Sequence, residues 1–141
     1  MKKKVILIFF IALTISSCEK QEMYDQLYGS WQIFGVSGSI LGSQPVRDFD
    51  IVTFGQSGKY SVSLNDTIIQ GGSYHIQRQP SKKYGEIKVD FLLVLNESFN
   101  NHPYANFYSW EPFDIIFYGS DTLTLSQVNV SDGFNYHFKR K

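Results

Sequence analysis

The chain is poor in cysteine and in long apolar runs, and it has no excess of charge of either sign. A single cysteine, Cys18, excludes an internal disulfide and a thiolate zinc site. Lys and Arg total 13, as do Asp and Glu, so no basic excess points to nucleic acid. We therefore expect no nucleic-acid partner. The 141 residues suit one domain built around a single core.

Patterns typical of catalysis and metal binding are also missing. The three histidines, His75, His102 and His137, are far apart, and none has the spacing of metal ligands. No glycine-rich phosphate loop is present, and residues 35–38 do not form the Gly-x-Ser-x-Gly pattern of a nucleophile elbow. The sequence therefore predicts no enzyme, with no catalytic residue, no metal and no cofactor.

What is present begins with a lysine-rich start and a short apolar run. Lys2, Lys3 and Lys4 precede the run from Val5 to Ile15, and these roughly 11 residues are too few to cross a ~30 Å hydrocarbon core. This arrangement is typical of a signal peptide. We therefore expect residues 1–17 to be removed on export.

The residues that close this segment, Ile15-Ser16-Ser17-Cys18, resemble the lipobox of bacterial lipoproteins. The resemblance implies that Cys18 is acylated and anchors the chain to the bacterial outer membrane, facing the periplasm or the cell surface. The alternative is an ordinary secretory signal followed by an incidental, exposed thiol. Cleavage removes three lysines and leaves a charge of 10 − 13 = −3, so attachment would rest on the acyl chains.

The segment after the cysteine, residues 18–26, is polar and acidic, and we expect it to be a solvated leash. The domain is expected to span residues 27–141. Gly29 permits a tight turn into the first strand, and Trp31 opens that strand with a large apolar side chain.

Aromatic residues make up 16% of the chain, and Phe and Tyr dominate, which favours strands over helices. Alternation of apolar and polar residues predicts eight strands and no convincing helix. The expected strands are 31–36, 49–54, 59–64, 67–77 with a bulge at Gly71-Gly72, 86–95, 113–118, 122–127 and 134–139.

Eight sequential antiparallel strands leave two free edges unless the sheet closes on itself. We therefore predict an all-β, eight-stranded antiparallel up-and-down barrel. Because successive connections alternate between the two ends, connections 37–45 and 96–111 share one mouth. Trp31 then lies at the opposite, closed end, where the Arg140 guanidinium is expected to lie over its ring.

Gly29-Ser30-Trp31 resembles the Gly-x-Trp motif that opens strand one in the lipocalin-like (calycin) group, and Arg140 resembles the late arginine that packs on that tryptophan. The resemblance covers roughly residues 27–141. It implies a lipocalin-like barrel whose closed end is formed by Gly29, Trp31 and Arg140.

The residues expected inside this barrel are mostly bulky. They are Tyr60, Val62, Phe91, Leu93, Phe113, Ile115, Tyr136 and Phe138. A barrel of eight strands is only just wide enough for its own side chains, so we expect a filled interior.

The aromatic connection at the mouth supplies the functional hypothesis. Tyr104, Phe107, Tyr108 and Trp110 offer the large, rigid contact area that binding surfaces use. We expect a non-enzymatic, membrane-anchored binding module that takes a protein or glycan partner through its mouth loops. Two alternatives stay open: these rings fold down to close the barrel, or the barrel carries a small apolar ligand inside.

Overall fold

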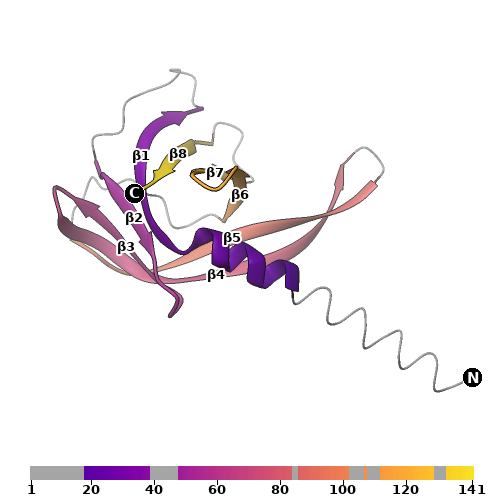
Figure 1. Cartoon of the computed structure of the whole chain (residues 1–141), viewed down its shortest axis with the longest axis horizontal. Coiled ribbons are helices and arrows are strands. Elements are labelled where there is room, and N and C mark those ends of the chain that lie inside the picture. The colour runs from indigo at the N-terminus through magenta and orange to yellow at the C-terminus, as the bar shows by residue number, and fades with distance from the viewer. Residues whose placement is uncertain (1–17, 39–47, 84–85, 102–106, 108–111, 129–132) are drawn as a thin grey trace, which may run out of the picture.

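A computed structural model describes residues 18–38, 48–83, 86–101, 107, 112–128 and 133–141, without the side chains of 81–83 and 86–89. The chain is all-β, and eight antiparallel strands close into a barrel in sequence order (Figure 1). The strands are β1 (Gly29–Ser37), β2 (Ile51–Phe54), β3 (Lys59–Leu64), β4 (Thr67–Lys83), β5 (Glu86–Asn100), β6 (Phe113–Tyr118), β7 (Thr122–Gln127) and β8 (Asn135–Arg140). The predicted fold class is confirmed.

The barrel closes through pairing of its first and last strands. β1 and β8 pair from Trp31↔Arg140 to Ser37↔Asn135, with a bulge between Ile33 and Gly35. The backbone N–H of Lys141 extends this contact by donating to the Ser30 carbonyl at 3.0 Å. Neither β1 nor β8 is therefore left with a free edge along this seam.

One turn and one bulge follow directly from residue type. Asn65 and Asp66 both have positive φ, 49° and 62°, as a two-residue hairpin turn between β3 and β4 requires. The β4–β5 register shifts between Gly71 and Gly72, which confirms the expected bulge. A Cβ added to Gly72 would lie 2.0 Å from the Asn96 carbonyl oxygen, so only glycine fits without a backbone shift.

The two central strands are longer than the sequence predicts. The expected turn at residues 79–83 is wrong, because β4 stays paired with β5 as far as Lys83↔Glu86. Pro80 is tolerated there because, among the described strands, β3 pairs with β4 only up to Lys59↔Ser73. The pair therefore extends past the barrel wall as a projecting hairpin (Figure 1).

Residues 18–27 are helical, which corrects the expectation of a solvated leash. Met23, Tyr24 and Leu27 follow helical spacing and pack against the core. Side-chain hydrogen bonds from Gln21 to Asp25 and from Gln26 to Glu22 support the exposed face. In the described part of the chain, no helix is long and apolar enough to span a membrane.

Candidate binding site at the barrel mouth

The mouth is the end of the barrel at which the β1–β2 and β5–β6 connections lie, since connections alternate between the ends in this topology. Three of the residues predicted to bind a partner, Tyr104, Tyr108 and Trp110, lie outside the described residues. Their binding role therefore stays a prediction.

The fourth predicted binding residue, Phe107, is not available to a partner, and this expectation is corrected. Its side chain is 2% exposed and stacks on Phe113, with ring centroids 5.4 Å apart. It also meets the rings of Phe49 and Tyr136 edge to face, with centroids 5.4 Å away in both cases. The physical reason is that a phenyl ring gains more from the core than from a hydrated loop.

The Gln70 side chain holds the backbone of Phe107 in place from inside the barrel. Its side chain is fully buried, and Nε2 donates to the Phe107 carbonyl at 3.3 Å, to Glu97 Oε2 at 2.8 Å and to the Tyr60 hydroxyl at 3.4 Å. Among the described residues, Gln70 Oε1 is the buried side-chain polar atom that accepts no hydrogen bond. The amide thus ties the β5–β6 connection to β4 and leaves one acceptor unused.

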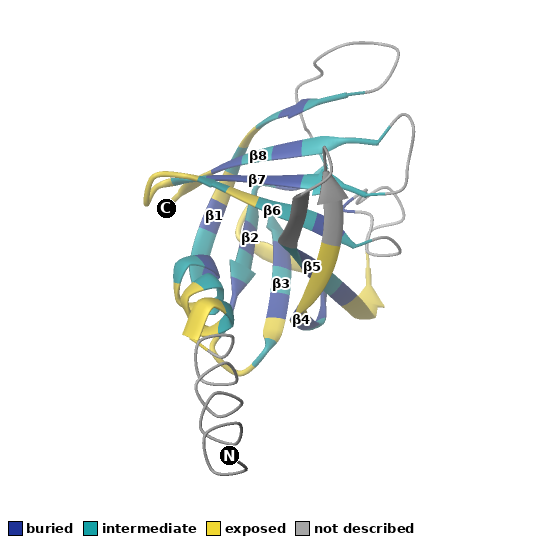
Figure 2. Cartoon of the chain, turned by 90° about the vertical axis from the view of Figure 1, so that its right-hand side faces the viewer, coloured by how far each residue is buried: buried dark blue, intermediate teal, exposed yellow. Residues whose placement is uncertain are grey.

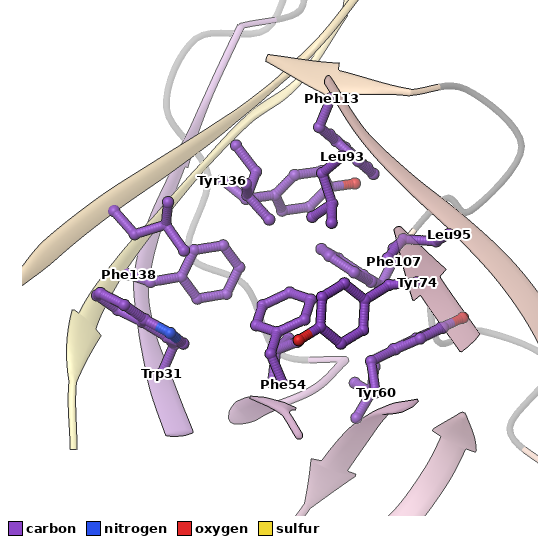
Figure 3. Close-up of a cluster of buried hydrophobic side chains, with 14 of the residues drawn as sticks. Trp31, Phe54, Tyr60, Tyr74, Leu93, Leu95, Phe107, Phe113, Tyr136 and Phe138 are labelled. Atoms are coloured by element: carbon purple, nitrogen blue, oxygen red, sulfur yellow. The ribbon is translucent and has the colours of Figure 1, made fainter. Parts of the chain in front are cut away.

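Side chains occupy the interior below Phe107. Six of the eight residues predicted to face inward are buried: Tyr60, Val62, Leu93, Phe113, Tyr136 and Phe138. The other two, Phe91 and Ile115, are partly buried and pack against the same cluster. Figure 2 shows the buried positions recurring along the strands, and Figure 3 shows rings from several strands pointing toward one another.

The closed end is organised by Trp31 and Arg140. Trp31 is fully buried, and the Arg140 guanidinium carbon lies 4.2 Å from its ring centroid, which is the contact expected from the sequence. Gly29 has a φ of +115°, and a Cβ there would lie 3.2 Å from Arg140 Nη1. Glycine is therefore required beside the guanidinium.

The same two side chains also cap the helix of residues 18–27. Arg140 donates to the carbonyls of Gln26 at 2.6 Å and Tyr28 at 2.8 Å, and Trp31 Nε1 donates to the Leu27 carbonyl at 2.8 Å. Carbonyls at a helix C-terminus lack partners within the helix and carry partial negative charge, so a cation is favoured there. The helix is thus fastened to the barrel, and the exposed Cys18 lies at its other end.

In the part of the chain that the structure describes, no alternative chemical site emerges on the outer wall. His137 is held between Ser37 Oγ, 2.8 Å from Nε2, and Thr124 Oγ1, 3.0 Å from Nδ1, so it serves a local hydrogen-bond network. Within the described ranges, no group of three His, Cys, Asp or Glu residues is placed to hold a metal ion.

Sequence reasoning missed Gln70 and Tyr24. Gln70 is buried because the β3–β4 register shifts between Val62 and Ser63, which places both Ile69 and Gln70 out of water. Tyr24 packs on the core and accepts a hydrogen bond from the Ile76 backbone N–H at 2.9 Å. The four-residue spacing of Tyr24 and Tyr28 was a usable signal for a helix.

Comparison of the chain with protein families, with curated proteins and with solved structures finds no match.

Proposed function

We propose that the chain is a lipid-anchored, non-enzymatic binding module with a lipocalin-like barrel, and that it holds a protein or glycan partner at its mouth. The observation that carries the proposal is the burial of Phe107 in the middle of the β5–β6 connection. A connection pinned at its centre by a buried ring loses less entropy on binding than a free loop does. The contact role falls to Tyr104, Tyr108 and Trp110, which flank the pinned residue in the sequence.

The filled interior supports binding at the rim rather than inside. Phe107 contacts Phe49, Phe113, Tyr136 and Phe138, with ring centroids 5.4 to 6.4 Å apart. A ligand of fatty-acid size would have to displace several of these rings, and each is worth several kcal/mol of packing, about 3–5 for a phenylalanine.

The proposed anchor is Cys18, with residues 1–17 as its signal peptide and the bacterial outer membrane as its location. Cys18 is exposed, as an acylation site needs. Because the helix of residues 18–27 is fastened at the closed end, the acyl chains would lie on that side and leave the mouth free. A cell producing the wild-type chain should incorporate labelled fatty acid into it, whereas Cys18→Ala should stay unlabelled and uncleaved. Equal labelling of both chains would contradict the anchor.

Site-specific photo-crosslinking in the cells that produce the protein tests the binding site. We expect p-benzoylphenylalanine at position 108 to give a discrete crosslinked product. The same residue at position 118 should give none, because Tyr118 is an exposed ring beside the β6–β7 turn at the opposite end. Crosslinking from 118 alone would place the partner elsewhere and overturn the proposal.

The competing function is a carrier of a small ligand, and the unused acceptor Gln70 Oε1 is the observation that favours it. Native mass spectrometry of the purified chain separates the two. A stoichiometric small molecule that is lost in Gln70→Leu would support the carrier, and a bare chain that still crosslinks from position 108 would support the binding module.

A further inference from the structure

Part of the β5 edge of the β4–β5 hairpin pairs with no other described strand. We call the projecting part of the hairpin, residues 77–83 and 86–91, the β4–β5 arm. β5 pairs with β6 only at Leu92↔Asp114 and Leu93↔Phe113, although the following β6 residues are described as well. Among the described strands, none pairs with residues 86–91 on the side away from β4 (Figure 1).

At its base, the opposite edge of the arm is covered by the helix of residues 18–27. The Ile76 N–H, just before the arm, donates to the Tyr24 hydroxyl at 2.9 Å, and Arg78 forms an ion pair with Glu19 at 3.4 Å. The helix therefore satisfies and shields the β4 edge at its base. Among the described residues, no strand covers the β5 edge of the arm, so its backbone donors and acceptors are a template for another strand.

We propose that this edge pairs antiparallel with the β5 edge of a second copy of the chain, about a two-fold axis through Val89. The choice of partner and register follows from charge. In an antiparallel pair, directly opposite residues lie on the same face. With the axis at Val89, Lys88 of each copy is opposite Asp90 of the other, and Ile87 is opposite Phe91.

The other symmetric registers are poorer. An axis at Lys88 sets Lys88 against itself and Glu86 against Asp90, so every charged residue faces a like charge. An axis at Asp90 sets two aspartates together. An axis at Ile87 pairs Glu86 with Lys88 favourably, but it uses only residues 86–88 of β5, whereas the Val89 axis uses 87–91. A two-fold pairing also closes on itself and does not grow into a filament.

Charge reversal and charge swapping test the pairing. All chains are full length and are studied in non-ionic detergent by sedimentation velocity. All carry Cys18→Ser, so that the native thiol does not interfere with the disulfide trapping described below. Lys88→Asp places aspartate against Asp90 twice in the dimer, so its dissociation constant should rise at least about tenfold. Adding Asp90→Lys in the same chain exchanges the two charges and should restore the constant to within about threefold.

The matched control is Lys139→Asp, the same charge change on an exposed residue of β8, which should leave the dimer unchanged. A chain that is monomeric at about 100 μM would overturn the proposal and leave the edge to a strand of a different protein. A dimer that is indifferent to Lys88→Asp would overturn it as well.

Disulfide trapping tests the register. Val89→Cys should form a covalent dimer under mild oxidation, because directly opposite Cβ atoms are about 4.5–5.5 Å apart. Ile87→Cys should not, because each Ile87 is opposite Phe91. Efficient trapping through Ile87→Cys but not Val89→Cys would reject the Val89 axis.

Discussion

The rings of Phe49 and Phe107 meet edge to face, with centroids 5.4 Å apart, and they come from the two connections that share the mouth. Phe49 precedes β2 and Phe107 precedes β6, so the contact joins segments far apart in sequence. Both rings are almost completely buried. The barrel is therefore closed at this point by its own side chains, and the mouth connections share one apolar anchor.

Replacing Phe107 should destabilise the domain, in contrast to replacing an aromatic residue that only contacts a partner. Phe107→Ala deletes a ring with four aromatic neighbours and should lower the free energy of unfolding by about 3–5 kcal/mol. Urea unfolding followed by tryptophan fluorescence measures this. Tyr118→Ala, at a ring that is 59% exposed, should change stability by less than about 0.5 kcal/mol. An unchanged midpoint and slope for Phe107→Ala would show that the ring is not in the core.

Replacing Arg140 should release the N-terminal helix before it unfolds the barrel. Arg140→Ala removes the donors to the Gln26 and Tyr28 carbonyls, so amide hydrogen exchange across residues 24–28 should speed up markedly while the amides of β7 stay protected. Lys139→Ala is the neighbouring control and should leave the helix protected. Unchanged exchange of the Tyr28 amide in Arg140→Ala would contradict this capping role.

The bulge at Gly72 should reject even one methyl group. An alanine Cβ would lie 2.0 Å from the Asn96 carbonyl oxygen, which is backbone and cannot rotate away. Gly72→Ala should therefore cost about 1–3 kcal/mol or more, measured by thermal or urea unfolding. Gly119→Ala has open space but a φ of +71°, so its cost should stay near the ~1 kcal/mol of left-handed backbone. An equally small decrease in the free energy of unfolding for both variants would show that the backbone at the bulge can shift to accommodate a Cβ.

Stability should fall at alkaline pH through Tyr74. Burial, followed by the charges of Tyr28 and Tyr24, raises the pKa of the Tyr74 phenol far above its ordinary value of ~10. The folded state therefore keeps a proton that the unfolded state releases, so this contribution is complete below pH ~10 and is lost as pH rises toward the folded pKa.

Tyr74→Phe should flatten the alkaline decline in the unfolding midpoint. The variant also loses the hydrogen bond to the Gly55 carbonyl, so it should be less stable than the wild type at neutral pH. Tyr118→Phe, at an exposed phenol, should keep the wild-type pH profile. An identical alkaline slope in the wild type and in Tyr74→Phe would assign the decline to other groups.

The barrel could be predicted because a strand with one buried face has apolar and polar residues in alternation. Val62 and Leu93 lie inside as alternation requires, and Asn65-Asp66 marks its turn by residue type alone. The helix of residues 18–27 was missed because polar and charged residues dominate its composition. The pairs Met23 and Leu27, and Tyr24 and Tyr28, carry the helical spacing in only two turns.

The mouth could be predicted only in part. Aromatic composition indicated a connection over residues 96–111, but residues 96–100 belong to β5. A residue outside a strand also has no period that says whether it points inward. Phe107 is buried, but no pattern in the aromatic sequence around it distinguishes a buried ring from an exposed one. Gln70 faces the interior because of a one-residue register shift, which a strand period cannot show.

The contacts of Trp31 and Arg140 at the closed end also set an order of folding. Trp31 pairs with Arg140 across 140 − 31 = 109 residues, and Arg140 holds the C-terminal carbonyls of the first helix. Contacts between such distant residues form late, because the intervening chain must first be ordered. A chain whose last strand has not yet paired thus lacks both the closed wall and the Arg140 contacts that fasten the helix. Both form together once β8 pairs with β1. Cleavage of the chain near either end should therefore open the barrel wall, release the helix and make the molecule sensitive to proteases.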